Sequence, residues 1–168
     1  MSQNKLPLSW NQIEKYCTEI AISILKSGFK PDYIVGITRG GLIPAVLISH
    51  ILEVPMHTLH VQLRDGQPND CESNCWMSED AFGYTENAKN ILVVDDINDS
   101  GDTINWIKWD WRSTCLPNDP KWDTVWGNNV KFATVVTNLG SKETVDYSAL
   151  EINKTENDVW IDFPWERS

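Results

Sequence analysis

The sequence predicts an α/β protein in which helices flank a mainly parallel sheet. Two runs of apolar and β-branched residues, at 91–94 and 130–137, have the composition of strands that are buried on both faces. Segments with helical spacing of apolar residues alternate with strand-like runs along the chain. Because parallel strands need long crossover connections, this alternation favours a parallel sheet that is covered on both sides.

The first half of the chain divides into helix, strand, helix and strand. Ser9 and Gln12 form a capping-box pair in front of a helix that we expect over residues 10–25. The run DYIVGI predicts a short strand and is followed by the turn TRGG. LIPAVLISHIL at 42–52 predicts a helix that is apolar almost all round, so we expect it to be buried. PMHTLHVQL, at 55–63, predicts a further strand.

The second half contains a long polar stretch and a strand, loop and helix unit. Residues 64–87 are too many for an ordinary connection and predict a lid or a disordered segment. NILVVDD predicts a central strand, and INWIKWDW at 104–111 predicts a helix. Residues 115–129 carry Pro, Gly and Asn and predict a surface excursion before the strand at 130–137.

Composition favours one domain, spanning residues 1–168, with a small-molecule partner. The formal charge of -10 comes from 14 Lys and Arg against 24 Asp and Glu, which disfavours a nucleic-acid-binding surface. No apolar run reaches the length of a membrane span, and the start lacks the pattern of a secretion signal, so we expect a cytoplasmic protein. Cys71 and Cys75 have the spacing of a metal or redox pair, but no second pair or nearby His completes a set, which favours free thiols.

The segment ILVVDDINDSGDT, at 91–103, places four aspartates beside residues that bind anions. A loop between a parallel strand and a helix presents free backbone N–H groups, and its serine, glycine and threonine suit a phosphate. Adjacent carboxylates about 4 Å apart repel by roughly 4 kcal/mol at an effective dielectric constant of 20. They therefore need a cation or hydroxyl donors, and a sugar phosphate with a divalent metal supplies both.

This segment resembles the phosphoribosyl pyrophosphate (PRPP) motif of type I phosphoribosyltransferases. The resemblance implies that fold, with a flexible lid at residues 62–87 and a small C-terminal hood at 138–168 that binds the base. It places Asp95 and Asp96 near the ribose hydroxyls and a hydrated Mg²⁺, which Asp96 binds mostly through water. It assigns the 5′-phosphate to Asp99, Ser100, Gly101, Asp102 and Thr103. Asp102 stands where the family often has glycine, so its side chain must point away from the phosphate.

A second motif, GITRGGLIPAVL, repeats the arrangement of strand, turn and helix. An arginine beside two glycines suits bidentate binding of a phosphate group. The motif resembles the pyrophosphate loop of the same family, which implies that Thr38, Arg39, Gly40 and Gly41 bind the leaving pyrophosphate. The resemblance also implies a non-proline cis peptide between Thr38 and Arg39.

Three other interpretations explain part of the aspartate-rich turn. A response-regulator receiver also has an acidic pair after its first strand, but that strand opens the domain, whereas this one begins at Ile91. The GxxxxGK[ST] pattern of a nucleotide-binding P-loop is absent from the sequence. Taken alone, the turn could simply satisfy its own backbone and cap a helix. The second phosphate-type motif favours the phosphoribosyltransferase reading.

The base is suggested by Asp99 and by two further segments of the chain. An aspartate at the place of Asp99 is typical of the 6-oxopurine enzymes, where it contacts N7 and acts as general acid and base; its alternative role is a helix cap. The segment DVWIDFPWE resembles bacterial xanthine-guanine phosphoribosyltransferase, which implies a base site of Trp160, Ile161 and Asp162, with Trp160 stacking on the purine. The segment LSWNQIEKYCTEIA resembles that enzyme's first helix, so the resemblance spans most of the chain.

Two departures from the family stand out. Asn138 occupies the place of the lysine that bonds the purine O6; we count it as a base-site residue, with Lys142 close by in sequence. The stretch 62–87 lacks the serine-tyrosine pair that is common at the start of the catalytic lid.

The reaction implied is transfer of the 5-phosphoribosyl group from PRPP to N9 of guanine, xanthine or hypoxanthine, with Mg²⁺ as cofactor and release of pyrophosphate. A non-catalytic PRPP- or nucleotide-binding regulatory module, or a phosphoribosyltransferase for another base, stays open. The tryptophans of NWIKWDW exceed what one helix face can bury, which indicates a homodimer or homotetramer.

Overall fold

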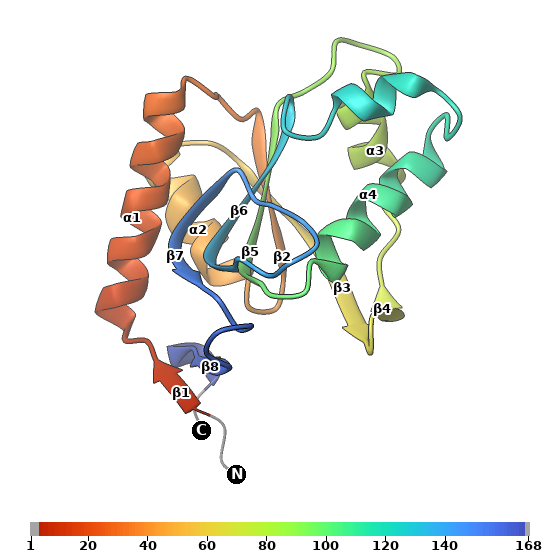
Figure 1. Ribbon diagram of the computed structural model, residues 1–168. Helices are drawn as coiled ribbons and strands as arrows, with labels where there is room; N and C mark the ends of the chain where they lie inside the picture. Colours follow the sequence, from red (N-terminus) through yellow and green to blue (C-terminus); the bar gives the residue numbers. More distant parts are fainter. Residues whose placement is uncertain (1–3, 167–168) are drawn as a thin grey trace.

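A computed structural model describes residues 4–166 and contains a central sheet of six strands in the order β4-β3-β2-β5-β6-β7. These strands are β2 (Tyr33–Thr38), β3 (Met56–Arg64), β4 (Gln67–Cys71), β5 (Ile91–Asn98), β6 (Val130–Asn138) and β7 (Tyr147–Ile152). Neighbouring strands are parallel except for the antiparallel pair β3 and β4. The predicted α/β fold with a mainly parallel sheet is confirmed (Figure 1).

Helices cover both faces of this sheet (Figure 1). α1 (Trp10–Ser27) and α2 (Leu42–Leu52) share one core cluster, and α3 (Cys75–Phe82) and α4 (Asp102–Thr114) share the other. The helix after β2 therefore lies on the opposite face from the helix after β5, although these two strands are neighbours. Where the connections of two neighbouring parallel strands leave to opposite faces of the sheet, a crevice forms at the carboxyl ends of these strands.

The helices α1 and α2 follow the sequence pattern, with one exception. The predicted capping box is present: Ser9 Oγ accepts from the Gln12 N–H, and the Ser9 N–H donates to Gln12 Oε1. α2 has the predicted bounds, but the expectation that it is buried all round is wrong. Val46 and Ile51 are 41% and 42% exposed. The helix α2 packs on the sheet and on α1, and no element of residues 4–166 covers its outer side.

The stretch 62–87, expected as a lid or as disorder, forms mostly regular structure, so the expectation of disorder is wrong, and a lid in this stretch stays a prediction. Its first part continues β3 and pairs with β4 to make a hairpin. Its second part is α3, which is capped by the Asn74 side chain and buries Met77, Ala81 and Phe82. Since α3 belongs to the core, only the β3–β4 hairpin is free to act as a lid.

The predicted surface excursion at 115–129 is confirmed for most of its residues, which are exposed, but part of the segment is anchored in the core. It contains the 3-10 helix η1 (Pro120–Thr124), and Trp122 is fully buried, with its Nε1 donating to the Cys115 carbonyl at 2.7 Å. Trp122 stacks on Trp126, with 5.6 Å between ring centroids. Several of the nine tryptophans are therefore core residues. Trp109 of α4 is 62% exposed, and the homo-oligomer stays a prediction.

A separate two-stranded sheet joins the two ends of the chain. β1 (Asn4–Pro7) pairs in parallel with β8 (Val159–Asp162), which is followed by the 3-10 helix η2 (Pro164–Glu166). We call β1, β8 and η2 the hood. It differs from the expected range 138–168, because β7 is the edge strand of the central sheet and β1 was not foreseen. No helix within residues 4–166 combines the length and apolar character that a membrane span requires.

Candidate active site

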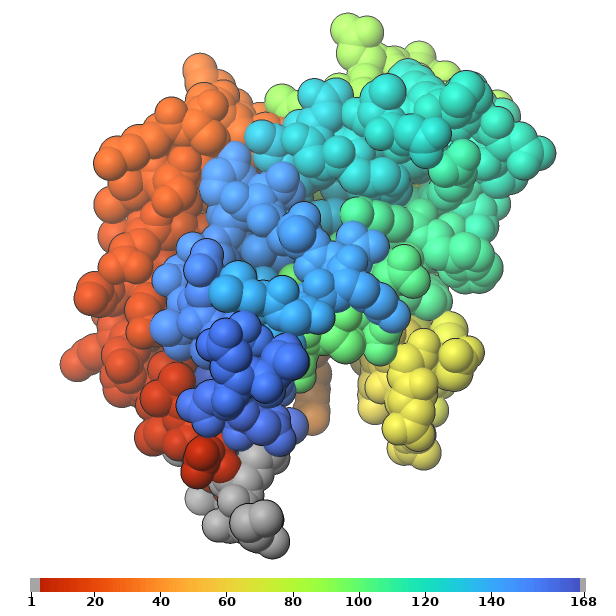
Figure 2. Space-filling view, viewed as in Figure 1, coloured from red at the N-terminus to blue at the C-terminus, as the bar shows by residue number. Residues whose placement is uncertain are grey.

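The turns after β2 and β5 meet at one edge of the sheet. The two strands pair directly, so their carboxyl ends lie side by side. A Cβ built on Gly40 would overlap the carboxylate of Asp96, which shows that the two turns are in close contact. Figure 2 shows a hollow on this side of the molecule, between the hood and the β3–β4 hairpin and bordered by the segment that follows β5. The two predicted phosphate sites therefore share one cleft.

The turn after β5 has the geometry of an anion cradle. Gly101 has a left-handed backbone (φ 91°), and a Cβ there would lie 2.7 Å from Ser141 Oγ. The N–H of Asp102, the first residue of α4, donates to Ser100 Oγ at 3.2 Å. The structure brings the five predicted phosphate residues together around a pocket of about 210 Å³, lined by Asp95, Asp96, Ile97, Asn98, Asp99, Ser100, Gly101, Asp102, Thr103, Ile104 and Thr134.

Asp102, which departs from the family pattern, is compensated by a cation. Its carboxylate forms an ion pair with Lys142 from the β6–β7 loop, and this pairing lowers the pKa of Asp102. A Cβ on Gly66, in the turn of the hairpin, would lie 3.2 Å from the same carboxylate. The Asp102 carboxylate thus faces Lys142 and the hairpin.

The acidic pair is held in an environment that disfavours charge. Asp95 and Asp96 are partly buried, and the Asp96 N–H donates to Asp95 Oδ1 at 2.8 Å. Burial raises the pKa of both carboxyls, and the charge of Asp96 raises the pKa of Asp95 further. A cation or hydroxyl donors would favour the ionised pair. Among the described residues, no three His, Cys, Asp or Glu side chains form a metal-binding group, and Cys71 and Cys75 are free thiols.

The turn after β2 contains the expected non-proline cis peptide between Thr38 and Arg39. Gly41 is required at its position, because a Cβ would lie 2.6 Å from the Ile37 carbonyl oxygen. Arg39 and Gly40 line a pocket of about 630 Å³ whose opposite wall is the hood, with Trp160, Trp165 and Glu166. Glu166 was not among the predicted site residues.

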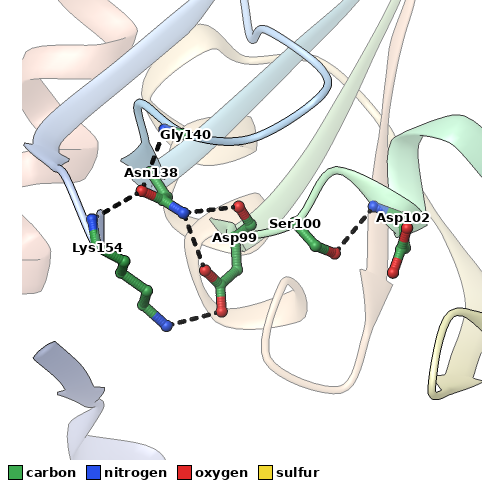
Figure 3. A network of polar contacts seen from close by, with 6 residues as sticks. All are labelled: Asp99, Ser100, Asp102, Asn138, Gly140 and Lys154. Carbon is green, nitrogen blue, oxygen red and sulfur yellow. Dashed lines mark hydrogen bonds and ion pairs between the residues drawn. The ribbon is translucent and has the colours of Figure 1, made fainter. Parts of the chain in front are cut away.

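Asn138, at the place of the missing lysine, belongs to a network of hydrogen bonds within the protein, as Figure 3 shows. Its Nδ2 donates to the backbone oxygen of Asp99 at 3.0 Å and to Asp99 Oδ1 at 3.3 Å. Its Oδ1 accepts from the N–H groups of Gly140 and Lys154. Because each end of this amide is bonded within the protein, Asn138 fixes Asp99, and its contact with the base stays a prediction.

A lysine that sequence reasoning missed reaches the base side of the cleft. Lys154 follows β7, and its Nζ donates to Asp99 Oδ2 at 2.8 Å (Figure 3). The same Nζ lies 5.7 Å from the centre of the Trp160 ring. Lys142, the candidate suggested by sequence proximity, pairs with Asp102 instead. The signal for Lys154 was the adjacency of β6 and β7, which places the residues after both strands at one edge of the sheet.

Of the predicted base-site residues of the hood, Trp160 and Ile161 line the same cleft. A small pocket is bounded by Asp99 and Lys154 on one side and by Trp160, Ile161 and Glu166 on the other. Trp160 is 47% exposed, whereas Ile161 is buried. The backbone carbonyl of Asp162 accepts from the Leu8 N–H at 3.0 Å and so ties the hood to the start of α1.

Comparisons with known proteins agree with this architecture. The family model described as phosphoribosyl transferase domain matches residues 8–167. The xanthine-guanine phosphoribosyltransferase of Cereibacter sphaeroides is 30% identical over 170 residues, covering 95% of this chain and 85% of that protein. That of Desulfotalea psychrophila is 26% identical, with the same coverage of both chains. The crystal structure of a purine phosphoribosyltransferase from Pyrococcus horikoshii has a TM-score of 0.70 and 26% identity, covering 98% of this chain and 95% of that one.

The family model covers the part of the chain that forms the two turns and most of the cleft. The matched range includes both phosphate-type turns and Trp160 of the hood. The resemblance expected from the sequence is thus confirmed, and so is the fold class. This chain belongs to the phosphoribosyl transferase domain family.

Proposed function

We propose that the protein transfers the 5-phosphoribosyl group from PRPP to N9 of a 6-oxopurine, with release of pyrophosphate. The observation that carries this proposal is the single cleft in which the β2 and β5 turns touch at Gly40 and Asp96. PRPP has a phosphate at one end and a pyrophosphate at the other, so two adjoining anion sites suit its two ends. The hood forms a wall opposite Arg39, where a base can stack.

Base recognition rests on residues from three parts of the chain. The exposed ring of Trp160 offers a stacking surface, and Asp162 supplies a carboxylate for an exocyclic amine. Lys154 Nζ donates a charged hydrogen bond, which suits the O6 of an oxopurine and not the amine of adenine. We therefore assign to Lys154 the role that the family gives to a lysine at the position of Asn138.

Asp99 is the proposed general acid and base. Its carboxylate lies between Lys154 and the phosphate turn, so it can accept the proton that the purine loses as N9 attacks C1 of the ribose. As the bond to pyrophosphate lengthens, the ribose gains positive charge, which the carboxylates of Asp95 and Asp96 stabilise. Both are already held by backbone N–H donors, and they need no rearrangement during the reaction.

The donor set fits a Mg²⁺ ion that is bound mainly through water and substrate. Asp96 faces Gly40 of the pyrophosphate turn, and Asp95 adjoins it, so both carboxylates lie where PRPP would bring its own oxygens. Mg²⁺ typically takes one or two carboxylates and completes its shell with water and phosphate. When bound, it neutralises the leaving pyrophosphate.

The β3–β4 hairpin is the proposed lid. Its turn approaches the phosphate cradle at Asp102, and its base adjoins Thr38 and Arg39. A hairpin in this place can cover PRPP and exclude water, which would otherwise hydrolyse the activated sugar.

The test is pyrophosphate release in the presence of PRPP, Mg²⁺ and a panel of guanine, xanthine, hypoxanthine, adenine and uracil. We expect release with the 6-oxopurines and little with adenine or uracil. Release with another base alone would refute the proposed substrate. Calorimetric binding of PRPP without turnover of any base would identify a regulatory module instead.

A further inference from the structure

His60 lies at the junction between the pyrophosphate turn and the hairpin. The pairing of β2 with β3 ends at Thr38 and His60, and the pairing of β3 with β4 begins one residue later, at Val61. The His60 N–H donates to Glu72 Oε1 at 3.1 Å, and the His60 carbonyl accepts from the Glu72 N–H at 2.8 Å. The backbone of His60 is therefore fixed from both sides.

The His60 imidazole connects the two elements. Nδ1 lies 2.5 Å from Thr38 Oγ1, and Nε2 lies 3.0 Å from Asp70 Oδ2 on β4. An ionised carboxylate only accepts, so the proton of a neutral imidazole is on Nε2 and Nδ1 accepts from the Thr38 hydroxyl. In the imidazolium form Nδ1 becomes a donor, and the Thr38 hydroxyl proton is free to bond another acceptor.

That acceptor can be an oxygen of a phosphate group that binds in the cavity beside the pyrophosphate turn. Thr38, Arg39, His60, Val61 and Gln62 line a cavity of about 440 Å³. The charged groups near His60 are Asp70 of β4, Glu72, which follows β4 and accepts from the His60 N–H, and Arg39 of the turn. A phosphate group bound in this cavity would bring negative charge and acceptor oxygens beside the imidazole and the Thr38 hydroxyl, and negative charge favours a cationic neighbour.

We propose that His60, oriented by Asp70, is a positioning residue for the pyrophosphate turn, and that pyrophosphate binding is coupled to proton uptake at its imidazole. Protonation releases the Thr38 hydroxyl to donate to a phosphate oxygen. The inference rests on the proposed function, because it concerns the same pyrophosphate site. It makes the hairpin a part of that site, since Asp70 is on β4.

Three substitutions separate the two contacts. His60→Asn keeps a polar atom near the place of Nδ1, and His60→Gln keeps one near the place of Nε2. Asp70→Asn changes a side chain that is 71% exposed, so the fold is expected to persist. His50→Asn, on the exposed side of α2, is the matched control.

The measurement is calorimetric binding of Mg²⁺-pyrophosphate between about pH 6 and pH 8, in buffers of different ionisation enthalpy. We expect His60→Gln and Asp70→Asn to bind pyrophosphate about tenfold more weakly. His60→Asn should recover part of this affinity, and all three variants should lose the proton uptake that the native protein shows. Binding of a purine mononucleotide, which lacks the pyrophosphate, should be unchanged.

The outcomes distinguish the inference from the function on which it rests. If the native protein binds pyrophosphate and Arg39→Gln weakens it, but the His60 and Asp70 variants bind with native affinity and proton uptake, the inference is overturned and the function stands. Failure of the native protein to bind pyrophosphate would overturn both.

Discussion

Lys154→Met removes the ammonium group of the proposed base-recognition lysine and keeps most of its stem. In the structure Nζ donates to Asp99 Oδ2 at 2.8 Å, and the Lys154 side chain is 18% exposed. A hydrogen bond with a charged partner contributes about 1.5–3 kcal/mol, which corresponds to about 10- to 150-fold. Asp99 is 44% exposed, so solvent screens the pair and we expect the lower part of this range.

The effect should depend on the base. For a 6-oxopurine, kcat/KM should fall by about 10- to 50-fold, because O6 loses its charged donor. Any residual reaction with adenine should change little or rise, because its exocyclic amine no longer meets an ammonium group. Lys142→Met is the comparison: this lysine pairs with Asp102, so the variant should alter PRPP binding and leave the preference between bases intact.

The assay is steady-state pyrophosphate release with each base at saturating PRPP. An equal loss of kcat/KM for oxo- and aminopurines would mean that Lys154 acts only through Asp99. An unchanged kcat/KM for every base would remove Lys154 from the site altogether.

Three further predictions concern the turns. Asp99→Asn should reduce turnover far more than PRPP affinity, measured by transient kinetics and calorimetry; equal losses would remove its role as general base. Asp95→Asn should stabilise the ligand-free protein by about 1 kcal/mol at pH 7 while weakening PRPP binding. The folded-state pKa of Asp95 is raised, so the folded state binds more protons and native stability falls as pH rises above the usual range of an aspartate; the stabilisation should disappear in thermal melts near pH 4. Gly41→Ala should destabilise the fold by about 1–3 kcal/mol in denaturant titrations, because the added Cβ would lie 2.6 and 2.7 Å from backbone carbonyl oxygens of β2 and β5; native-like stability would contradict this packing.

The elements that the sequence predicts well are those with long local patterns. α1 carries its own cap and apolar stripe, and β5 and β6 are continuous apolar runs. β4 and α3 escaped prediction for opposite reasons. QPNDC of β4 is polar because it forms a sheet edge, and α3 has only eight residues, too few to show a helical period clearly. β1 and β8 are four residues each and are strands because they pair with each other.

The site residues also divide into those that belong to a local sequence pattern and those that long-range contacts bring to the cleft. The residues of each turn were predictable because a strand, a glycine turn and a helix are consecutive in sequence. Asn138 was expected at the base because it follows a strand, yet the structure shows its amide bonded to Asp99. Lys154 belongs to no motif and reaches the cleft only because β7 pairs with β6. Such long-range contacts cannot be read from local periodicity.

The parallel pairing of β1 with β8 has a consequence for how substrate preference can change. Leu6 of β1 is opposite Ile161, so the strand that carries Trp160 is supported by the beginning of the chain and not by the central sheet. Replacements in this small sheet leave the hydrogen bonds between β2 and β5 untouched. Under the proposed function, natural variation or directed evolution can therefore change the base preference here without altering the two turns that are proposed to bind PRPP.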